Sequence, residues 1–139
     1  MSHAGPVRCH TGMALCEHRY QRLIQWVEDG RVAFEAGRYF EAVGTWVLAW
    51  REESGASRQL LQGLMQVAGA YRKQELAEPI GMIKLLLLAI ERIGPIPDGF
   101  AGLRLDDFRA GLERSRREAI IWVGGGPRPG PAAPLGRVE

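Results

Sequence analysis

The sequence predicts an all-α protein, with four to five antiparallel helices forming a compact bundle of helical hairpins. Apolar residues recur at spacings of three and four along most of the chain, which is typical of amphipathic helices. Gly and Pro interrupt this pattern at short intervals, as expected for turns between neighbouring helices. The alternation of apolar and polar residues that marks a half-buried strand is missing from the sequence.

The chain has 139 residues, 46% hydrophobic and 24% charged, which is ordinary for one soluble domain. We expect a flexible leader over residues 1–16, a helical-bundle domain over residues 17–123 and a disordered, Gly/Pro-rich tail over residues 124–139. Because no signal peptide or long apolar run is present, the expected location is the cytoplasm, away from the membrane. The net charge of +2 is spread over interleaved acidic and basic residues and argues against nucleic acid.

The first helix is predicted over residues 17–36, with Gly37 as its C-terminal stop. Gly30 lies inside this helix and costs about 1 kcal/mol relative to Ala. The apolar positions that recur at helical spacing are Tyr20, Leu23, Ile24, Val27 and Phe34.

The second helix is predicted over residues 39–51. Phe40, Val43, Val47 and Trp50 share one side of it at a 3-4-3 spacing, which predicts that this stripe is buried. Aromatic residues at helical spacing are more often core than pocket lining. We therefore expect core positions for Trp26, Trp46 and Trp50.

Three more helices are predicted over residues 58–75, over residues 79–93 and from about residue 106 onward. Ser57 is the expected N-cap of the first of these, and residues 120–123 either extend the last or pack as a short terminal strand. A loose match at an offset of 40 residues suggests two stacked hairpins without establishing a repeat. It pairs Ala42, Trp46, Ala49 and Trp50 with Met82, Leu86, Ala89 and Ile90.

Three segments carry a family resemblance. The chain reads EAVGTWVLAW at residues 41–50, QGLMQVA at residues 62–68 and AEPIGM at residues 77–82. In order and spacing they resemble the patterns E-A-H-E-x-W-E-x-x-W, Q-G-L-I-Q-x-A and G-N-x-x-G-A of the small all-helical bacterial and archaeal proteins described as domain of unknown function 309. The resemblance covers about residues 30–93. It implies a helical bundle whose biochemical role is unsettled.

The departures from the family pattern concern its ionisable residues. The family's His falls on Val43, and its two Glu fall on Gly44 and Val47. In typical members these positions would present an imidazole and two carboxylates, which suit a metal or acid–base chemistry. A further His common in such proteins falls on Lys73. The resemblance therefore implies that this chain has lost a histidine-based site, and no catalytic residue is predicted.

Two other groups of residues are weaker candidates. Glu41, Gln62 and Gln66, with Trp46 and Trp50, would line a polar pocket between the second and third helices, although a structural hydrogen-bond pair of the two amides is the favoured explanation. A zinc site is disfavoured because the spacing of its candidates matches no known motif, so no metal or cofactor is predicted. Those candidates are Cys9, His10, Cys16 and His18.

Two functional hypotheses follow. The leading one is a non-catalytic helical bundle that acts through contact with a protein partner or through self-association as a homo-oligomer, because apolar residues replace the polar face. The alternative is a hydrolase-like or small-ligand-binding protein that uses the polar pocket.

A cluster of basic residues near the C-terminal end is expected to be a solvated helix face: Arg104, Arg109, Arg114, Arg116 and Arg117.

Overall fold

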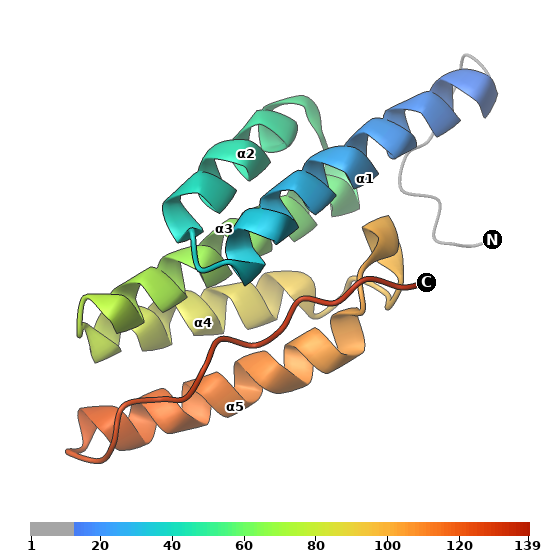
Figure 1. The fold of residues 1–139 in the computed structure, drawn as a ribbon. Helices are drawn as coiled ribbons and strands as arrows, with labels where there is room; N and C mark the ends of the chain where they lie inside the picture. Colours follow the sequence, from blue (N-terminus) through green and yellow to red (C-terminus); the bar gives the residue numbers. More distant parts are fainter. Residues whose placement is uncertain (1–12) are drawn as a thin grey trace.

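The computed structural model describes residues 13–139, with side chains from residue 17 onward. Over this range the chain forms five α-helices and one 3-10 helix, in which each α-helix packs against the next along the chain (Figure 1). The elements are α1 (Met13–Glu35), α2 (Tyr39–Glu52), α3 (Gly55–Glu75), α4 (Pro79–Ile93), η1 (Phe100–Gly102) and α5 (Leu105–Val123). The prediction of an all-α bundle is confirmed. Among these helices, none is both long and apolar enough to span a membrane.

Some helix boundaries differ from the sequence-based prediction. Helix α1 begins at Met13, inside the segment predicted to be a leader. Helix α3 begins at Gly55, so Ser54 takes the N-cap position and Ser57 is buried in the first turn. Residues 120–123 belong to α5, which decides between the two predicted alternatives in favour of a helix.

The hairpins α1–α2 and α3–α4 are structural repeats. Helices α2 and α4 begin 40 residues apart, at Tyr39 and Pro79. The turns before them place Gly37 and Ala77 in the left-handed region, with φ of 78° and 57°. Each turn closes with the same backbone hydrogen bond of 2.9 Å: Arg38 N–H to Ala33 O, and Glu78 N–H to Lys73 O. The offset of 40 residues therefore holds for the backbone geometry of the two turns.

The buried face of α2 is not the one predicted. Ala42, Trp46 and Ala49 are fully buried, whereas Phe40 keeps 89% of its surface exposed. The predicted stripe is therefore displaced around the helix from the buried one. Trp46 determines the buried face because its indole fits against Gly30 of α1, where any side chain would overlap it.

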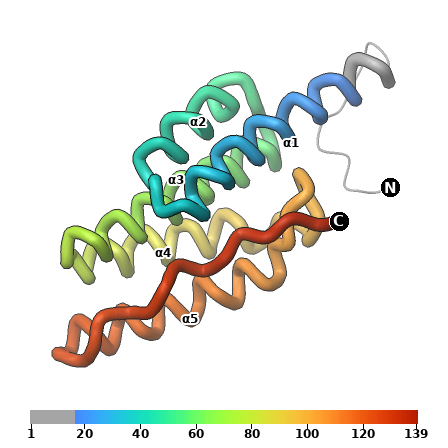
Figure 2. The backbone as a smooth tube through the Cα atoms, viewed as in Figure 1, coloured from blue at the N-terminus to red at the C-terminus, as the bar shows by residue number. Residues whose placement is uncertain are grey.

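The predicted disorder of residues 124–139 is not confirmed. After α5 the chain turns back and runs along this helix toward η1 (Figure 2). Ala133 and Leu135 are fully buried. The Gly- and Pro-rich composition indicated a segment that buries too little apolar surface to order itself. Here, however, side chains of α1 and α3 satisfy its backbone groups, and the bundle supplies the groove.

Candidate functional site

Helix α2 carries a second apolar stripe beside its buried one. Its members are Phe40, Val43, Val47 and Trp50, the residues expected in the core. Val43 and Trp50 pack partly against the core, and Val47 is half-buried. Phe40 projects into solvent with 89% of its surface exposed. The stripe is thus a partly open apolar surface.

Helix α3 borders this stripe at both of its ends. At the first turn of α2, Phe40 lines an open pocket of about 490 Å³ together with Arg72 and Glu75 of α3. At the other end, the guanidinium of Arg58 lies 3.8 Å from the centre of the Trp50 ring, a cation–π contact. The apolar stripe is therefore flanked by charged side chains, as are the centres of many protein interfaces.

The repeat reproduces the stripe on α4. At an offset of 40 residues, Phe40, Val43, Val47 and Trp50 correspond to Ile80, Ile83, Leu87 and Ile90. Ile83 and Ile90 pack partly against the core, whereas Ile80 and Leu87 remain 60% and 48% exposed. The two helices therefore agree at three of the four positions, and they differ at the third, where Val47 is half-buried and Leu87 is exposed.

The positions of the family's ionisable residues lie on this open face. Gly44 is exposed, and a Cβ placed on it would have no neighbour within 4 Å. Val43 and Val47 are half-buried. The backbone at Gly44 thus leaves room for a side chain, and this chain has no ionisable group at any of the three positions.

The structure does not gather the residues of the predicted polar pocket. Glu41 is exposed and pairs with Arg38 at 3.2 Å, and it lines the same pocket as Arg72. Gln66 lies six residues before Arg72 on α3, which is about 9 Å along the helix axis, and Gln62 lies ten residues before it, about 15 Å away. Trp46 belongs to the core, and Trp50 is half-buried beneath Arg58.

The amides of Gln62 and Gln66 are both partly buried on α3. Gln66 Oε1 is shielded from solvent and accepts no hydrogen bond within the described part of the chain. The sequence favoured a structural hydrogen-bond pair of these two amides. The contacts of Gln66 Oε1 do not support such a pair.

The zinc candidates fall largely outside the described residues. Cys9 and His10 are not described, and Cys16 is described only as part of the backbone of α1. His18 is exposed in the same helix. Among the side chains that the structure does describe, no three His, Cys, Asp or Glu residues come together as a metal site would require.

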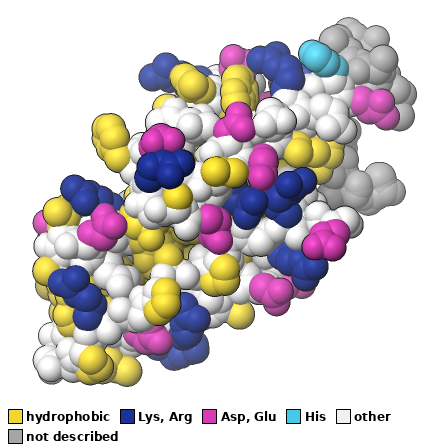
Figure 3. Space-filling view, viewed as in Figure 1, with side chains coloured by type: hydrophobic (Ala, Val, Ile, Leu, Met, Phe, Trp, Pro, Cys, Tyr) yellow, Lys and Arg dark blue, Asp and Glu magenta, His cyan; other side chains and the backbone are white. Residues whose placement is uncertain are grey.

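The basic residues near α5 mostly bind groups of the chain itself. Arg109 Nη1 donates to the carbonyl oxygens of Ile93 and Ile96, at 3.1 and 2.7 Å. Arg104 and Arg114 donate to the carbonyl oxygens of Arg137 and Pro131 in the segment that follows α5. In the face shown in Figure 3, basic and acidic side chains are interspersed, as expected for a solvated mixed-charge surface.

One carboxylate of the bundle is buried. Glu53 follows α2 and retains 8% of its surface. Burial raises the pKa of its carboxyl above the ordinary value of 4.5, and the nearby charge of Arg19 and the Ser57 hydroxyl oppose that rise. A carboxylate with a raised pKa is often functional, but Glu53 lies at the opposite end of α2 from Phe40, so it takes no part in the open pocket there.

Comparison with known proteins gives one match. Residues 27–85 match the model of the family described as domain of unknown function 309. The predicted family assignment is confirmed for these residues. No curated protein and no solved structure matched the chain. The matched residues cover the end of α1, all of α2 and α3 and the first half of α4, and they include the apolar stripe of α2.

Proposed function

We propose that the protein is a non-catalytic helical bundle that acts through protein–protein contact, with the apolar stripe of α2 as its contact surface. The observation that carries this proposal is the 89% exposure of Phe40 at the end of a stripe that continues through Val43, Val47 and Trp50. An exposed aromatic ring next to further apolar side chains is typical of an interface centre.

The energetics favour burial of this stripe by a partner. Each Å² of apolar surface removed from water contributes about 25 cal/mol. The ion pairs beside Phe40, Arg38–Glu41 at 3.2 Å and Arg72–Glu75 at 3.0 Å, are exposed and contribute little in the free protein. They would form a polar rim around the apolar centre of an interface.

The absence of ionisable side chains at three family positions supports the non-catalytic part of the proposal. Val43, Gly44 and Val47 cannot transfer a proton or bind a metal through their side chains. The chemistry that the family pattern would support at this face is therefore replaced by an apolar surface.

The simplest occupant of the stripe is a second copy of the chain. Light scattering coupled to size-exclusion chromatography should give a mass that rises with protein concentration. The double variant Phe40→Glu/Val47→Glu should remain monomeric at the concentrations where the wild type associates. Val32→Glu is the matched control, because Val32 is an apolar residue of α1 that is 50% exposed, and this variant should associate as the wild type does.

A wild-type protein that stays strictly monomeric, and that captures no partner in a pull-down, would count decisively against this function. Association of the double variant as strong as that of the wild type would also count against this function, because the contact would then lie outside the α2 stripe.

The second candidate is a small-ligand-binding protein. It is favoured by the open pocket of about 490 Å³ in which Glu41 and Arg72 meet. Metal analysis of the purified protein and a melting screen against metabolites would separate the two functions. A large thermal shift that is lost in Glu41→Gln would support the ligand-binding protein over the interaction module.

A further inference from the structure

The segment that follows α5 is held like a bound peptide. Residues 124–139, called here the tail segment, run back along α5 (Figure 1) and make hydrogen bonds with side chains of α1, α3 and α5. Gln74, Arg114 and Glu118 bind backbone groups of residues 129–131. Beyond these residues the segment is held at three anchors, at Ala133, at Leu135 and at residues 136–138. Each anchor binds backbone groups of the segment, which is how grooves recognise extended peptides.

The first anchor accepts only a small side chain. Ala133 is fully buried, and its N–H donates to Tyr71 Oη at 2.9 Å. Tyr71 Oη also lies 2.8 Å from Ser115 Oγ, which holds the hydroxyl in place. Gly111 forms the facing wall, where an added Cβ would come within 2.7 Å of the Ala133 methyl. The combination of Gly and Ala therefore sets the depth of the groove.

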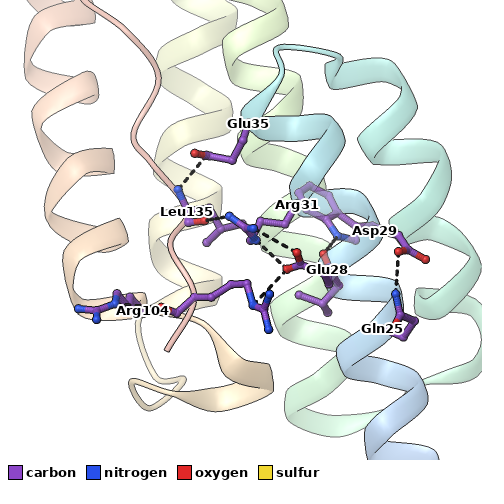
Figure 4. Close-up of polar contacts among 10 residues, drawn as sticks. Gln25, Glu28, Asp29, Arg31, Glu35, Arg104 and Leu135 are labelled. Carbon is purple, nitrogen blue, oxygen red and sulfur yellow. Dashed lines mark hydrogen bonds and ion pairs between the residues drawn. The ribbon is translucent and has the colours of Figure 1, made fainter. Parts of the chain in front are cut away.

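The second anchor combines an apolar slot with two charged side chains of α1. Leu135 is fully buried, and its N–H donates to Glu35 Oε2 at 3.0 Å. Arg31 Nη1 donates to Leu135 O at 3.0 Å (Figure 4). Arg31 is in turn held by Glu28 at 2.8 Å, so the donor is fixed before the segment docks.

The third anchor resembles the pairing of two β-strands. Arg104 N–H donates to Gly136 O at 2.9 Å, and Val138 N–H donates to Gly102 O at 2.8 Å. Leu103 and Arg137 form an antiparallel bridge between these bonds. Because backbone atoms make these contacts, they hold any extended segment that enters in this register.

A glycine hinge connects the tail segment to α5. The three residues after Val123 are Gly124, Gly125 and Gly126, and Gly125 has φ of 101°. Glycine adopts other backbone conformations here at little cost. The hinge can therefore direct the segment along its own bundle or away from it while the groove contacts stay the same.

We propose that the groove formed by α1, α3, α5 and η1 is a peptide-binding groove, and that the tail segment of a second copy of the chain replaces the chain's own segment in it. The chain's own segment seated there shows the chemistry of the occupant: an extended backbone, a small side chain at position 133 and Leu at position 135. A second copy carries the same features by definition.

Exchange of identical segments makes the same contacts in the closed and in the exchanged form, and this is a low-cost route to a dimer. The closed form has the advantage of a high effective concentration, so exchange depends on protein concentration and on release of the chain's own segment. This groove is separate from the α2 stripe, and the inference goes beyond the contact proposed there.

Two complementary full-length variants test the exchange. Leu135→Asp releases the chain's own segment and leaves its groove intact. Gly111→Val blocks the groove through the contact with Ala133 and leaves the segment intact. Each variant alone should be monomeric at a concentration where an equimolar mixture gives a species of twice the mass. A mixture that remains monomeric would overturn the proposal.

A labelled synthetic peptide of residues 127–139 provides a second measurement, which does not need Gly111→Val to fold. It should bind Leu135→Asp at least tenfold more tightly than it binds the wild-type chain, whose groove is occupied. The same peptide with Asp in place of Leu135 should not bind. Equal binding to both chains, or no binding to Leu135→Asp with an intact circular dichroism spectrum, would overturn the groove.

The Phe40→Glu substitution in both members of the complementary pair separates this inference from the proposed function. Tail exchange should be unchanged by it, since Phe40 lies on α2 and the groove is formed by other elements. If Phe40→Glu abolished the mixed dimer, the dimer would have formed through the α2 stripe, and tail exchange would be refuted.

Discussion

The indole of Trp46 lies directly against the backbone of Gly30, in the space that a side chain on Gly30 would occupy. Trp46 Nε1 donates a hydrogen bond to Val27 O at 3.2 Å, almost one turn earlier in α1. The sequence marks Gly30 as a weak point of α1. In the structure it is the residue that allows α1 and α2 to approach closely enough to bury Trp46.

Gly30→Ala should therefore destabilise the protein. Overpacking costs about 1–3 kcal/mol, and a Cβ that would overlap the indole nitrogen places the cost in the upper part of this range, above the gain of about 1 kcal/mol in helix propensity. Gly44→Ala is the control, because its Cβ meets no neighbour within 4 Å, and it should be neutral or stabilising. Urea unfolding of both variants measures the difference. Similar effects of the two substitutions would contradict the close contact with Trp46.

Tyr71→Phe should loosen the tail segment. The substitution leaves the N–H of Ala133 without its acceptor, at a cost of about 1–3 kcal/mol. Hydrogen exchange at the Ala133 amide should become faster. Tyr20→Phe removes a comparable bond, from Ala101 N–H at 3.1 Å, and should leave exchange at Ala133 unchanged. A disordered tail segment would instead exchange rapidly in the wild type.

Restoring the family residues on α2 should create a metal site. The triple variant Val43→His, Gly44→Glu and Val47→Glu should bind Zn²⁺, since positions on one helical face bring an imidazole and two carboxylates together. Some stability should be lost, because positions 43 and 47 are half-buried. Titration calorimetry compares this variant with Gly44→Glu alone. Equal affinities would refute the correspondence with the family pattern.

Glu53→Gln should stabilise the protein at neutral pH. Burial raises the pKa of Glu53 in the folded state above the ordinary 4.5, so the folded state favours the protonated carboxyl. Its contribution to stability is therefore present below the unfolded pKa and is lost as the pH rises through the folded pKa. Gln keeps the neutral shape at every pH. The stability that Glu53→Gln gains over the wild type should therefore become smaller as the pH falls toward 4.

Urea unfolding between pH 4 and pH 8 checks this prediction. The control is Glu52→Gln, because the neighbouring Glu52 has a side chain that is 56% exposed and pairs with Arg22 only at the surface. Its stability should stay within about 0.5 kcal/mol of the wild type. A pH dependence of the wild type that is unchanged by Glu53→Gln would place the titrating group elsewhere.

The helices could be predicted because their signals are local. The turn at Gly37 and the Pro at position 79 are breakers that act through backbone geometry alone. The family resemblance rested on the same local spacing.

The candidate site could be predicted only in part. The sequence placed Phe40, Val43, Val47 and Trp50 on one side of α2, which is correct, but it predicted that this side is buried. It missed the groove of the tail segment. The one available signal was the pair of apolar residues Ala133 and Leu135 within a Gly- and Pro-rich stretch.

The sequence by itself determined that this chain is a bundle of hairpins, because helical periodicity and chain breakers depend on neighbours only a few residues away. The tertiary structure decided which of two apolar faces of α2 is buried, since both satisfy the spacing and the indole of Trp46 fits against the bare backbone of Gly30. It also decided that the tail segment is ordered, although its composition predicts disorder. The side-chain bonds that hold Ala133 and Leu135 join residues 62 to 104 positions apart, a separation at which no local pattern gives a signal.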